Sequence, residues 1–223
     1  MDVGPDPRRF ENLPAEFPIF PLAGALLLPG GKLPLNVFEP RYLAMVEDAL
    51  AERRCIGMIQ PDAAHAHGET GPALYRVGCV GRLVSFSETE DGRYLITLAG
   101  LSRFEVVREL DMRRGYRRIR AGFGPFAADL VDGGQTPLAE RPALLTALRA
   151  YFQARGFDAN WDVIESMEDD ALVTTLAMVC PFGSVEKQAL LEAPPDGPRA
   201  QTLLALLRMG AHEQPRDGGS PPS

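Results

Sequence analysis

The sequence predicts an α+β fold, in which a small β-barrel or pseudo-barrel with one helix is followed by a bundle of about four helices. Three observations support this prediction. Residues 17–123 hold mostly short apolar runs broken by proline and glycine, residues 140–212 repeat apolar side chains every three or four positions, and a weakly patterned, glycine-containing linker over 124–139 separates them. Residues 1–16 and 213–223 are rich in proline, glycine and charge, so we expect disordered tails there.

Four elements are expected at the start of the barrel region. Residues 17–22 and 33–38 are short apolar runs interrupted by prolines, a pattern typical of edge strands. Residues 39–54 predict a helix, because Pro40 suits a first helical position and apolar side chains follow at spacings of three and four. The apolar run over 55–59 predicts a buried strand.

The clearest β pattern lies between residues 74 and 122. Two strand-like runs meet at Asp91-Gly92, a pair typical of hairpins because glycine adopts the positive φ that a tight turn needs. Further strands are expected over 104–110 and 116–121, which gives about seven strands around one helix. Closing the sheet hides its edges, so a small barrel or pseudo-barrel is the expected arrangement.

Four helices are expected after the linker. Ser184 is a candidate N-cap for the third of them, and Asp196 with Pro198 is expected to begin the fourth. The other helices are predicted from apolar stripes at helical spacing. These stripes consist of Leu144, Leu148 and Phe152, then Leu172, Leu176 and Val179, and in the last helix Leu203, Leu204 and Leu207.

Composition and charge exclude several function classes. The chain carries a formal net charge of −7 and has a pI near 5.1, which disfavours a main role in neutralising nucleic-acid phosphates. Lys32 and Lys187 are the only lysines among 23 basic residues, so chemistry that needs an amine nucleophile or a phosphate-binding lysine is restricted to two positions.

The cysteine content and the apolar runs predict the compartment. Cys55, Cys79 and Cys180 are odd in number and widely separated, so we expect reduced core residues in a reducing environment. No apolar run is long enough to cross a bilayer, and the N-terminus does not resemble a secretory signal. A soluble, cytoplasmic protein without a membrane partner is therefore expected.

No motif predicts catalysis or a cofactor. Gly31-Lys32 lacks the first glycine and the Ser/Thr of a phosphate loop, and residues 122–127 match a dinucleotide fingerprint only loosely because Pro125 interrupts it. Neither a nucleophile elbow nor a zinc-protease motif occurs. We therefore expect no catalytic residue and no cofactor.

The pair His65 and His67 is the one candidate for metal binding. With Asp62 or Glu69 it could hold a transition metal, because alternate residues of an extended chain share a face. A solvated loop is the favoured alternative, since two exposed imidazoles seldom form a site without supporting hydrogen bonds. We expect no metal, and the question of these two histidines stays open.

Residues 103–120 form a locally basic stretch. They hold seven arginines against three carboxylates, so an RNA contact or an acidic-peptide contact is one interpretation. The candidate RNA contacts are Arg113, Arg114, Arg117 and Arg118. The alternative is a hairpin whose charged edges prevent aggregation, and we favour it.

Several sequence strings occur in the same order as in a known family. The most specific are Phe17-Pro-Ile-Phe-Pro-Leu22 and Leu33-Pro-Leu-Asn-Val-Phe-Glu-Pro-Arg-Tyr42, and they are followed by Gly100-Leu-Ser-Arg-Phe104, Glu186-Lys-Gln-Ala-Leu-Leu-Glu192 and Arg199. This order resembles the amino-terminal, substrate-binding domain of the Lon protease family over nearly all of residues 17–209.

The resemblance implies a PUA-like β-domain followed by a helical bundle, in agreement with the periodicity. It also implies capture of unfolded or tagged polypeptide, a role that full-length Lon enzymes combine with separate ATPase and serine-lysine protease domains. This sequence shows neither catalytic domain. We therefore expect a free-standing, non-enzymatic protein that binds unfolded or exposed hydrophobic polypeptide segments and acts as an adaptor to a protease or chaperone, with PUA-like RNA binding as the alternative.

Four residues of the matched string are the candidate peptide contacts. Phe38 and Tyr42 would line an apolar groove for an extended peptide, and packing in the core is the alternative. Glu39 and Arg41 would contact the same ligand. Their alternative role is local, because Glu39 suits a helix N-terminus and Arg41 can pair with a carboxylate.

Overall fold

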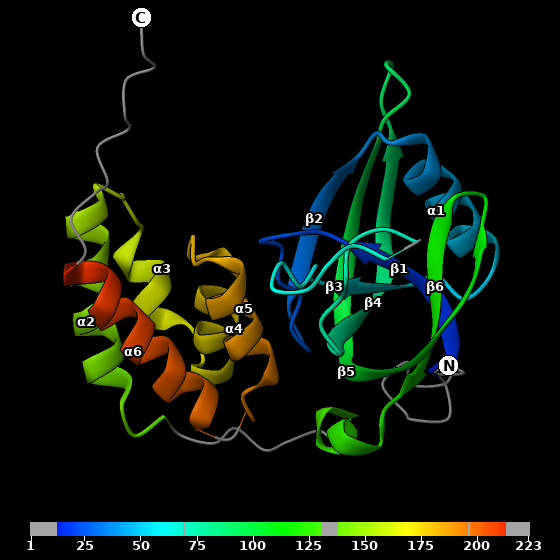
Figure 1. The fold of residues 1–223 in the computed structure, drawn as a ribbon. Coiled ribbons are helices and arrows are strands. Elements are labelled where there is room, and N and C mark those ends of the chain that lie inside the picture. Colours follow the sequence, from blue (N-terminus) through cyan, green and yellow to red (C-terminus); the bar gives the residue numbers. More distant parts are fainter. Residues whose placement is uncertain (1–12, 69, 131–137, 196, 213–223) are drawn as a thin grey trace, which may run out of the picture.

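A computed structural model describes residues 13–68, 70–130, 138–195 and 197–212 and shows a β-barrel beside a helical bundle (Figure 1). Residues 1–12 and 213–223 of the predicted tails, and 131–137 of the predicted linker, lie outside these ranges, as do Glu69 and Asp196. Leu13 is already buried, and the first strand begins at Glu16.

Six strands and one helix form the barrel in the described ranges. The strands are hydrogen-bonded in the order β2-β5-β4-β3-β1-β6, and β6 also pairs with β5. This last pairing closes a ring of five strands, so the predicted barrel is confirmed, with β2 added along β5. The elements are β1 (Glu16–Pro21), β2 (Lys32–Val37), α1 (Pro40–Ala51), β3 (Cys55–Ile59), β4 (Val77–Glu88), β5 (Tyr94–Arg113) and β6 (Tyr116–Gly122).

Strand β5 replaces two strands of the prediction, which is why there are six strands and not about seven. It runs for 20 residues and pairs with β2 and β4 in its first half and with β6 in its second half. Gly100 lies within this strand, between the two runs that were predicted as separate strands. Glycine is required at this position because the backbone of Leu28 approaches it closely, and a Cβ would lie 2.0 Å from the Leu28 carbonyl oxygen.

Strand β1 is not an edge strand, and the prediction drawn from its prolines is wrong. Residues 16–18 pair antiparallel with β6, and residues 19–21 pair in parallel with β3. Each proline therefore has a registered partner on one side only, and its missing amide can face away from the ladder. Strand β2 does lie at the edge, as predicted.

The helix α1 and the strand β3 agree with the prediction. Pro40 occupies the start of α1, and the side chains on its inner face, such as Met45 and Val46, are fully buried. All five residues of β3 are buried. The predicted hairpin at Asp91-Gly92 also forms, with Gly92 at φ 75°.

Five α-helices follow the barrel in the described ranges, one more than the prediction. The additional helix is the short α3, whose N-cap Asn160 accepts a hydrogen bond from the Val163 amide at 3.3 Å. Ser184 is the first residue of its helix and not the cap, because Gly183 occupies the N-cap position. The segments are η2 (Gly124–Leu130, a 3-10 helix), α2 (Arg141–Arg155), α3 (Trp161–Ser166), α4 (Asp169–Val179), α5 (Ser184–Glu192) and α6 (Pro198–His212).

Barrel and bundle share one hydrophobic core. A continuous cluster of buried side chains runs from Leu27 and Leu98 of the barrel to Leu172 and Leu190 of the bundle. A second cluster around Phe104 lies inside the barrel. None of the described helices is long and apolar enough to span a membrane.

Candidate functional site

The β4–β5 hairpin and the end of β2 lie at the end of the barrel that points away from η2 (Figure 1). Four large apolar side chains of these segments are exposed. We call Phe38, Val84, Phe86 and Leu95 the apolar tip. Their exposed fractions are 61%, 52%, 41% and 46%. Large apolar side chains grouped in this way are typical of surfaces that bind other molecules.

The strand register explains why these side chains face solvent. Leu95 pairs with Asn36 of β2 and Ser87 of β4, whereas its neighbour Ile96 points into the core. Phe86 belongs to the same face as Ile96, but it lies near the open end of the barrel. Its ring contacts the Tyr94 ring edge-on, with centroids 5.0 Å apart.

Phe38 follows the last residue of β2 and precedes the first turn of α1. The Arg93 guanidinium lies 5.7 Å from the centre of its ring, and Arg93 in turn pairs with Asp91 at 2.8 Å. The end of β2 and the β4–β5 hairpin together form a narrow ribbon. The apolar tip therefore covers both of its faces, with Phe38 and Leu95 on one face and Phe86 on the other.

The structure separates the four predicted peptide contacts. Glu39 is the N-cap residue of α1 and accepts a hydrogen bond from Arg41 Nε at 3.0 Å, so these two exposed residues form a local pair beside Phe38. Tyr42 is in the core, with its ring 4.2 Å from that of Phe20. The pKa of Tyr42 is raised, chiefly by this burial.

The arginines proposed for RNA binding are mostly held by carboxylates. Arg113 pairs with Glu52 at 2.7 Å, and Arg114 pairs with Glu47 at 2.8 Å. Asp48 contacts both arginines and also accepts a hydrogen bond from Tyr116 at 2.7 Å. Burial, and after it this hydrogen bond, raises the pKa of Tyr116 to about 12. These bonds fasten the β5–β6 hairpin to α1.

Arg117 is also a structural residue. Its guanidinium is buried, pairs with Glu109 at 2.5 Å and donates to the Pro72 carbonyl at 2.7 Å. Arg118 is partly exposed. With three of its four candidate contacts paired within the protein, RNA binding gains no support from the geometry.

The contacts of the histidine side chains are local. His65 Nδ1 lies 2.7 Å from Asp62 Oδ2, and both His65 and His67 are exposed. Across the described residues, no three His, Cys, Asp or Glu side chains are grouped closely enough to hold a metal ion. The three cysteines are free and buried, as predicted.

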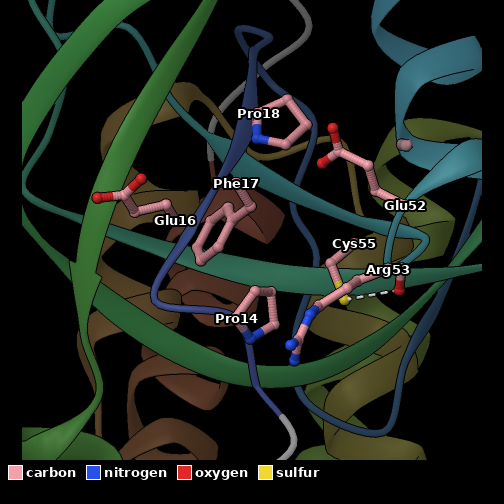
Figure 2. A pocket seen from close by; sticks show the side chains of 8 residues that line it. Pro14, Glu16, Phe17, Pro18, Glu52, Arg53 and Cys55 are labelled. Atoms are coloured by element: carbon pink, nitrogen blue, oxygen red, sulfur yellow. Dashed lines mark hydrogen bonds between the residues drawn. The ribbon is translucent and has the colours of Figure 1, made fainter.

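A pocket of about 410 Å³ lies between the start of β1 and the C-terminal end of α1 (Figure 2). Its two acids are paired outside the pocket, Glu16 with Arg120 and Glu52 with Arg113. Cys55 donates its thiol proton to the Arg53 carbonyl at 3.4 Å, and burial raises its pKa, so the thiol stays protonated. The pocket therefore holds no activated nucleophile.

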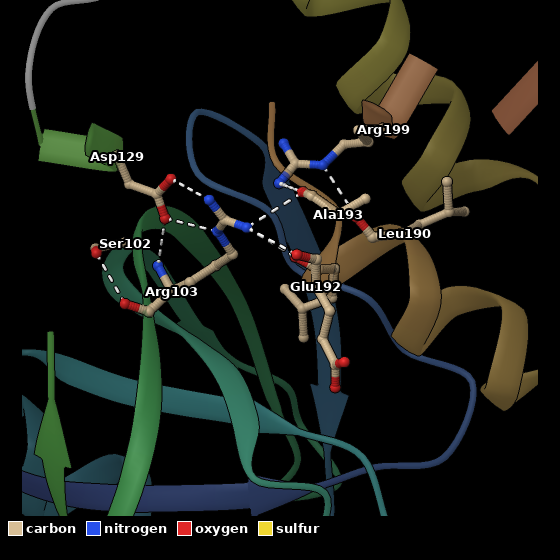
Figure 3. A network of polar contacts seen from close by, with 8 residues as sticks. Ser102, Arg103, Asp129, Leu190, Glu192, Ala193 and Arg199 are labelled. Atoms are coloured by element: carbon tan, nitrogen blue, oxygen red, sulfur yellow. Dashed lines mark hydrogen bonds and ion pairs between the residues drawn. The ribbon is translucent and has the colours of Figure 1, made fainter. Parts of the chain in front are cut away.

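A polar network joins the barrel to the bundle, and the side chains of its central ion pair, Arg103 and Asp129, are buried (Figure 3). Arg103 of β5 makes a bidentate pair with Asp129 of η2, at 2.9 and 2.8 Å. Its remaining Nη1 donates to three carbonyls at the end of α5. Arg199 donates to the Leu190 and Ala193 carbonyls from the other side, so two cations cover the negative end of the α5 dipole.

The other end and the side of α5 are held by the barrel as well. Gln60 donates to the Ser184 carbonyl at 3.0 Å, and Gln188 donates to the Val77 carbonyl at 3.1 Å. Lys187 donates to the Gly24 carbonyl at 2.7 Å, and burial lowers its pKa. One of the two lysines of the chain is thus committed to the interface.

Three residues of the apolar tip, namely Val84, Phe86 and Leu95, were not predicted as contacts from the sequence. One signal for Leu95 was available, because Tyr94, Ile96 and Leu98 alternate inward and place Leu95 on the opposite face. For Val84 there was none, since it stands at a register shift between Leu83 and Ser85.

Comparisons with known proteins agree on one family. Residues 16–208 match the ATP-dependent protease La (LON) substrate-binding domain. The chain is 34% identical to the Lon protease of Anaeromyxobacter dehalogenans over 110 residues, which are 49% of this chain and 13% of that protein. Against Lon protease 1 of Bdellovibrio bacteriovorus it is 25% identical over 198 residues, 86% of this chain and 24% of the relative.

A solved structure supports the fold. The Lon N-terminal domain protein from Xanthomonas campestris is similar with a TM-score of 0.60 and 24% identity, over 85% of this chain and 97% of that one. The chain spans about an eighth of the length of the first curated Lon proteases it matches. On the evidence of the fold and of the match over residues 16–208, the chain belongs to the family of Lon substrate-binding domains.

Proposed function

We propose that the apolar tip binds exposed hydrophobic segments of unfolded polypeptide and that the protein catalyses no reaction. The observation that carries the proposal is the exposure of Phe38, Val84, Phe86 and Leu95 on one projecting ribbon. Membership of a substrate-binding family supports it. Phe38 thereby keeps its predicted role, and Tyr42 supports the site from the core.

The size of the apolar tip fits weak and sequence-tolerant binding. Full burial of one large apolar side chain is worth about 1.5–3 kcal/mol, and these side chains are about half exposed. Each therefore contributes about 1 kcal/mol when covered. Four such contributions sum to about 4 kcal/mol, which corresponds to an affinity near the millimolar range and suits the reversible capture of many different segments.

We place the contact on the side chains of the ribbon and not on the free edge of β2. That edge carries Lys32 and Pro34, and proline offers no amide to a pairing strand. Edge strands with such residues resist the addition of another strand. Binding through side chains also tolerates many sequences, as capture of unfolded chains requires.

The rest of the described chain supports a binding role. Lys187 is committed to carbonyls, and burial raises the pKa of Cys79 and Cys180 as well as that of Cys55. We propose further that the protein acts in the cytoplasm, where free buried cysteines persist, and that it delivers captured segments to a protease or chaperone.

Fluorescence anisotropy with a labelled, permanently unfolded polypeptide tests the proposal. The double variant Phe38→Ala/Leu95→Ser removes two apolar contacts, which together contribute about 2 kcal/mol to the binding free energy, so we expect binding to weaken about 30-fold. Val163→Ala/Met209→Ala is the matched control, because it removes two equally exposed apolar side chains from the bundle. Equal weakening by both variants, or no binding by the wild type, would contradict the proposal.

A further inference from the structure

The charges around the apolar tip are unevenly compensated. Three guanidinium groups close to the apolar tip have carboxylate partners. The pairs are Arg93 with Asp91 at 2.8 Å, Arg41 with Glu39 at 2.8 Å, and Arg114 with Glu47 at 2.8 Å and with Asp48 at 3.0 Å.

Two carboxylates of the same ribbon are not compensated. Glu88 and Glu90 are exposed, and neither forms an ion pair or hydrogen bond with any described residue. Glu88 pairs in register with Tyr94, whose ring contacts Phe86, and Glu90 lies in the turn beyond it. One free negative charge therefore lies on the same face as the Phe86 ring, and a second lies in the adjacent turn.

The negative charge of Glu88 acts on the hydroxyl group of Tyr94. The pKa of Tyr94 is raised, first by partial burial, then by its hydrogen bond to Glu47, with the charges of Glu47 and Glu88 acting in the same direction. A cation bound beside Tyr94 would be favoured for the same reason that the phenolate is disfavoured.

We infer that the segments captured by the apolar tip are cationic as well as apolar, with arginine or lysine flanking the aromatic or aliphatic residues. The flanking cations would lie against Glu88 and Glu90 while the apolar side chains cover Phe86 and its neighbours. Acidic segments would be rejected, because the same carboxylates repel them. This inference rests on the proposed function and narrows its substrate class.

The expected preference is moderate, because the carboxylates are exposed. A unit charge pair about 7 Å apart in water is worth roughly a factor of three in affinity, so two pairs give about tenfold at low salt. Raising the ionic strength to about 1 M shortens the screening length to about 3 Å, and the preference should almost disappear. The apolar contribution stays at high salt.

Four labelled peptides of equal length test the inference by fluorescence anisotropy. Three share a Phe-Leu centre and carry arginine, serine or glutamate at the flanks, and the fourth carries arginine flanks around a serine centre. We expect the arginine-flanked apolar peptide to bind about tenfold more tightly than the serine-flanked one. The glutamate-flanked peptide should bind most weakly of these three.

The variant Glu88→Gln/Glu90→Gln should reduce the arginine preference to about twofold and leave the serine-flanked peptide unchanged. Its matched control is Asp158→Asn/Asp162→Asn, which removes two exposed carboxylates from the helical bundle and should keep the preference. Equal binding of arginine- and serine-flanked peptides, with a loss in Phe86→Ser, which lies on the same face as Glu88, would overturn the inference and leave the proposed function standing. Tight binding of the serine-centred peptide, or no binding of any apolar peptide, would overturn the proposed function itself.

Discussion

The barrel–bundle interface and the apolar tip use similar residue types in opposite ways. At the interface, the side chains of Arg103 and Asp129 are 5% and 1% exposed, and their charges are satisfied by one another and by carbonyls. At the tip, charged groups are solvated while Phe38 and Leu95 face water. The polar groups of the interface are therefore structural, whereas the uncovered apolar groups of the tip are available for binding.

The largest effect is expected from breaking the interface. Arg103→Met leaves the Asp129 carboxylate buried without its partner, so the free energy of unfolding should fall by about 3–5 kcal/mol. Urea denaturation measures this value. The free energy of unfolding should fall less in the double variant Arg103→Met/Asp129→Leu than in Arg103→Met. A fall below about 1 kcal/mol in Arg103→Met would show that the pair is not a structural element of the interface.

Tyr42 tests the boundary between core and surface. Tyr42→Ala removes a buried ring packed on Phe20 and should cost about 3–4 kcal/mol in unfolding free energy. Tyr42→Phe keeps the ring and serves as the control, with a cost below about 1 kcal/mol. A small loss in Tyr42→Ala would instead place this side chain at the surface.

Asp48 makes a pH-dependent contribution of intermediate size to the free energy of unfolding. Partial burial alone would raise its pKa, but hydrogen bonds from Tyr116 and Arg114 and the charges of Arg113 and Arg114 outweigh it and hold the pKa below its usual value of 3.8. The stabilisation is therefore complete above about pH 5 and is lost as the pH falls through the folded-state pKa.

Asp48→Asn should lower the unfolding free energy at pH 7 by about 1–2 kcal/mol. Because the variant has already lost this contribution, its stability should decline less than that of the wild type between pH 5 and pH 2. Thermal unfolding across this range gives the comparison. A parallel decline in both proteins would show that Asp48 is not the titrating group.

The smallest effect on stability is expected at the tip. Phe38→Ala/Leu95→Ser changes solvated side chains and should alter the unfolding free energy by no more than about 1 kcal/mol, while it weakens peptide binding. Calorimetry and anisotropy on the same sample separate the two effects. A large loss of stability would mean that the apolar tip serves the fold.

Local patterns predicted the elements but not all of their neighbours. The helix after Pro40, the buried strand over 55–59 and the hairpin at Asp91-Gly92 follow from spacing, proline and glycine within a few residues. The position of β1 between β3 and β6 could not follow in this way. It depends on pairings with residues 57–59 and 118–120, which are set by closure of the barrel.

The candidate site shows the same limit. Phe38 stood in a recognisable string, yet its sequence gave no means of telling it from Tyr42, which α1 turns into the core. The arginines of 103–120 looked like one basic surface. Their partners, such as Glu47 and Asp129, come from other elements, so only the fold reveals which charges remain free.

The late position of β5 in the chain has a consequence for synthesis on the ribosome. Among the described strands, β2 pairs only with β5, whose first residue lies more than fifty positions later in the chain. During translation β2 therefore has no strand partner, and the hydrogen-bonding groups of both its edges stay unpaired, until the β4–β5 hairpin has left the exit tunnel. Lys32 and Pro34 then protect a nascent strand against pairing with neighbouring chains during that interval.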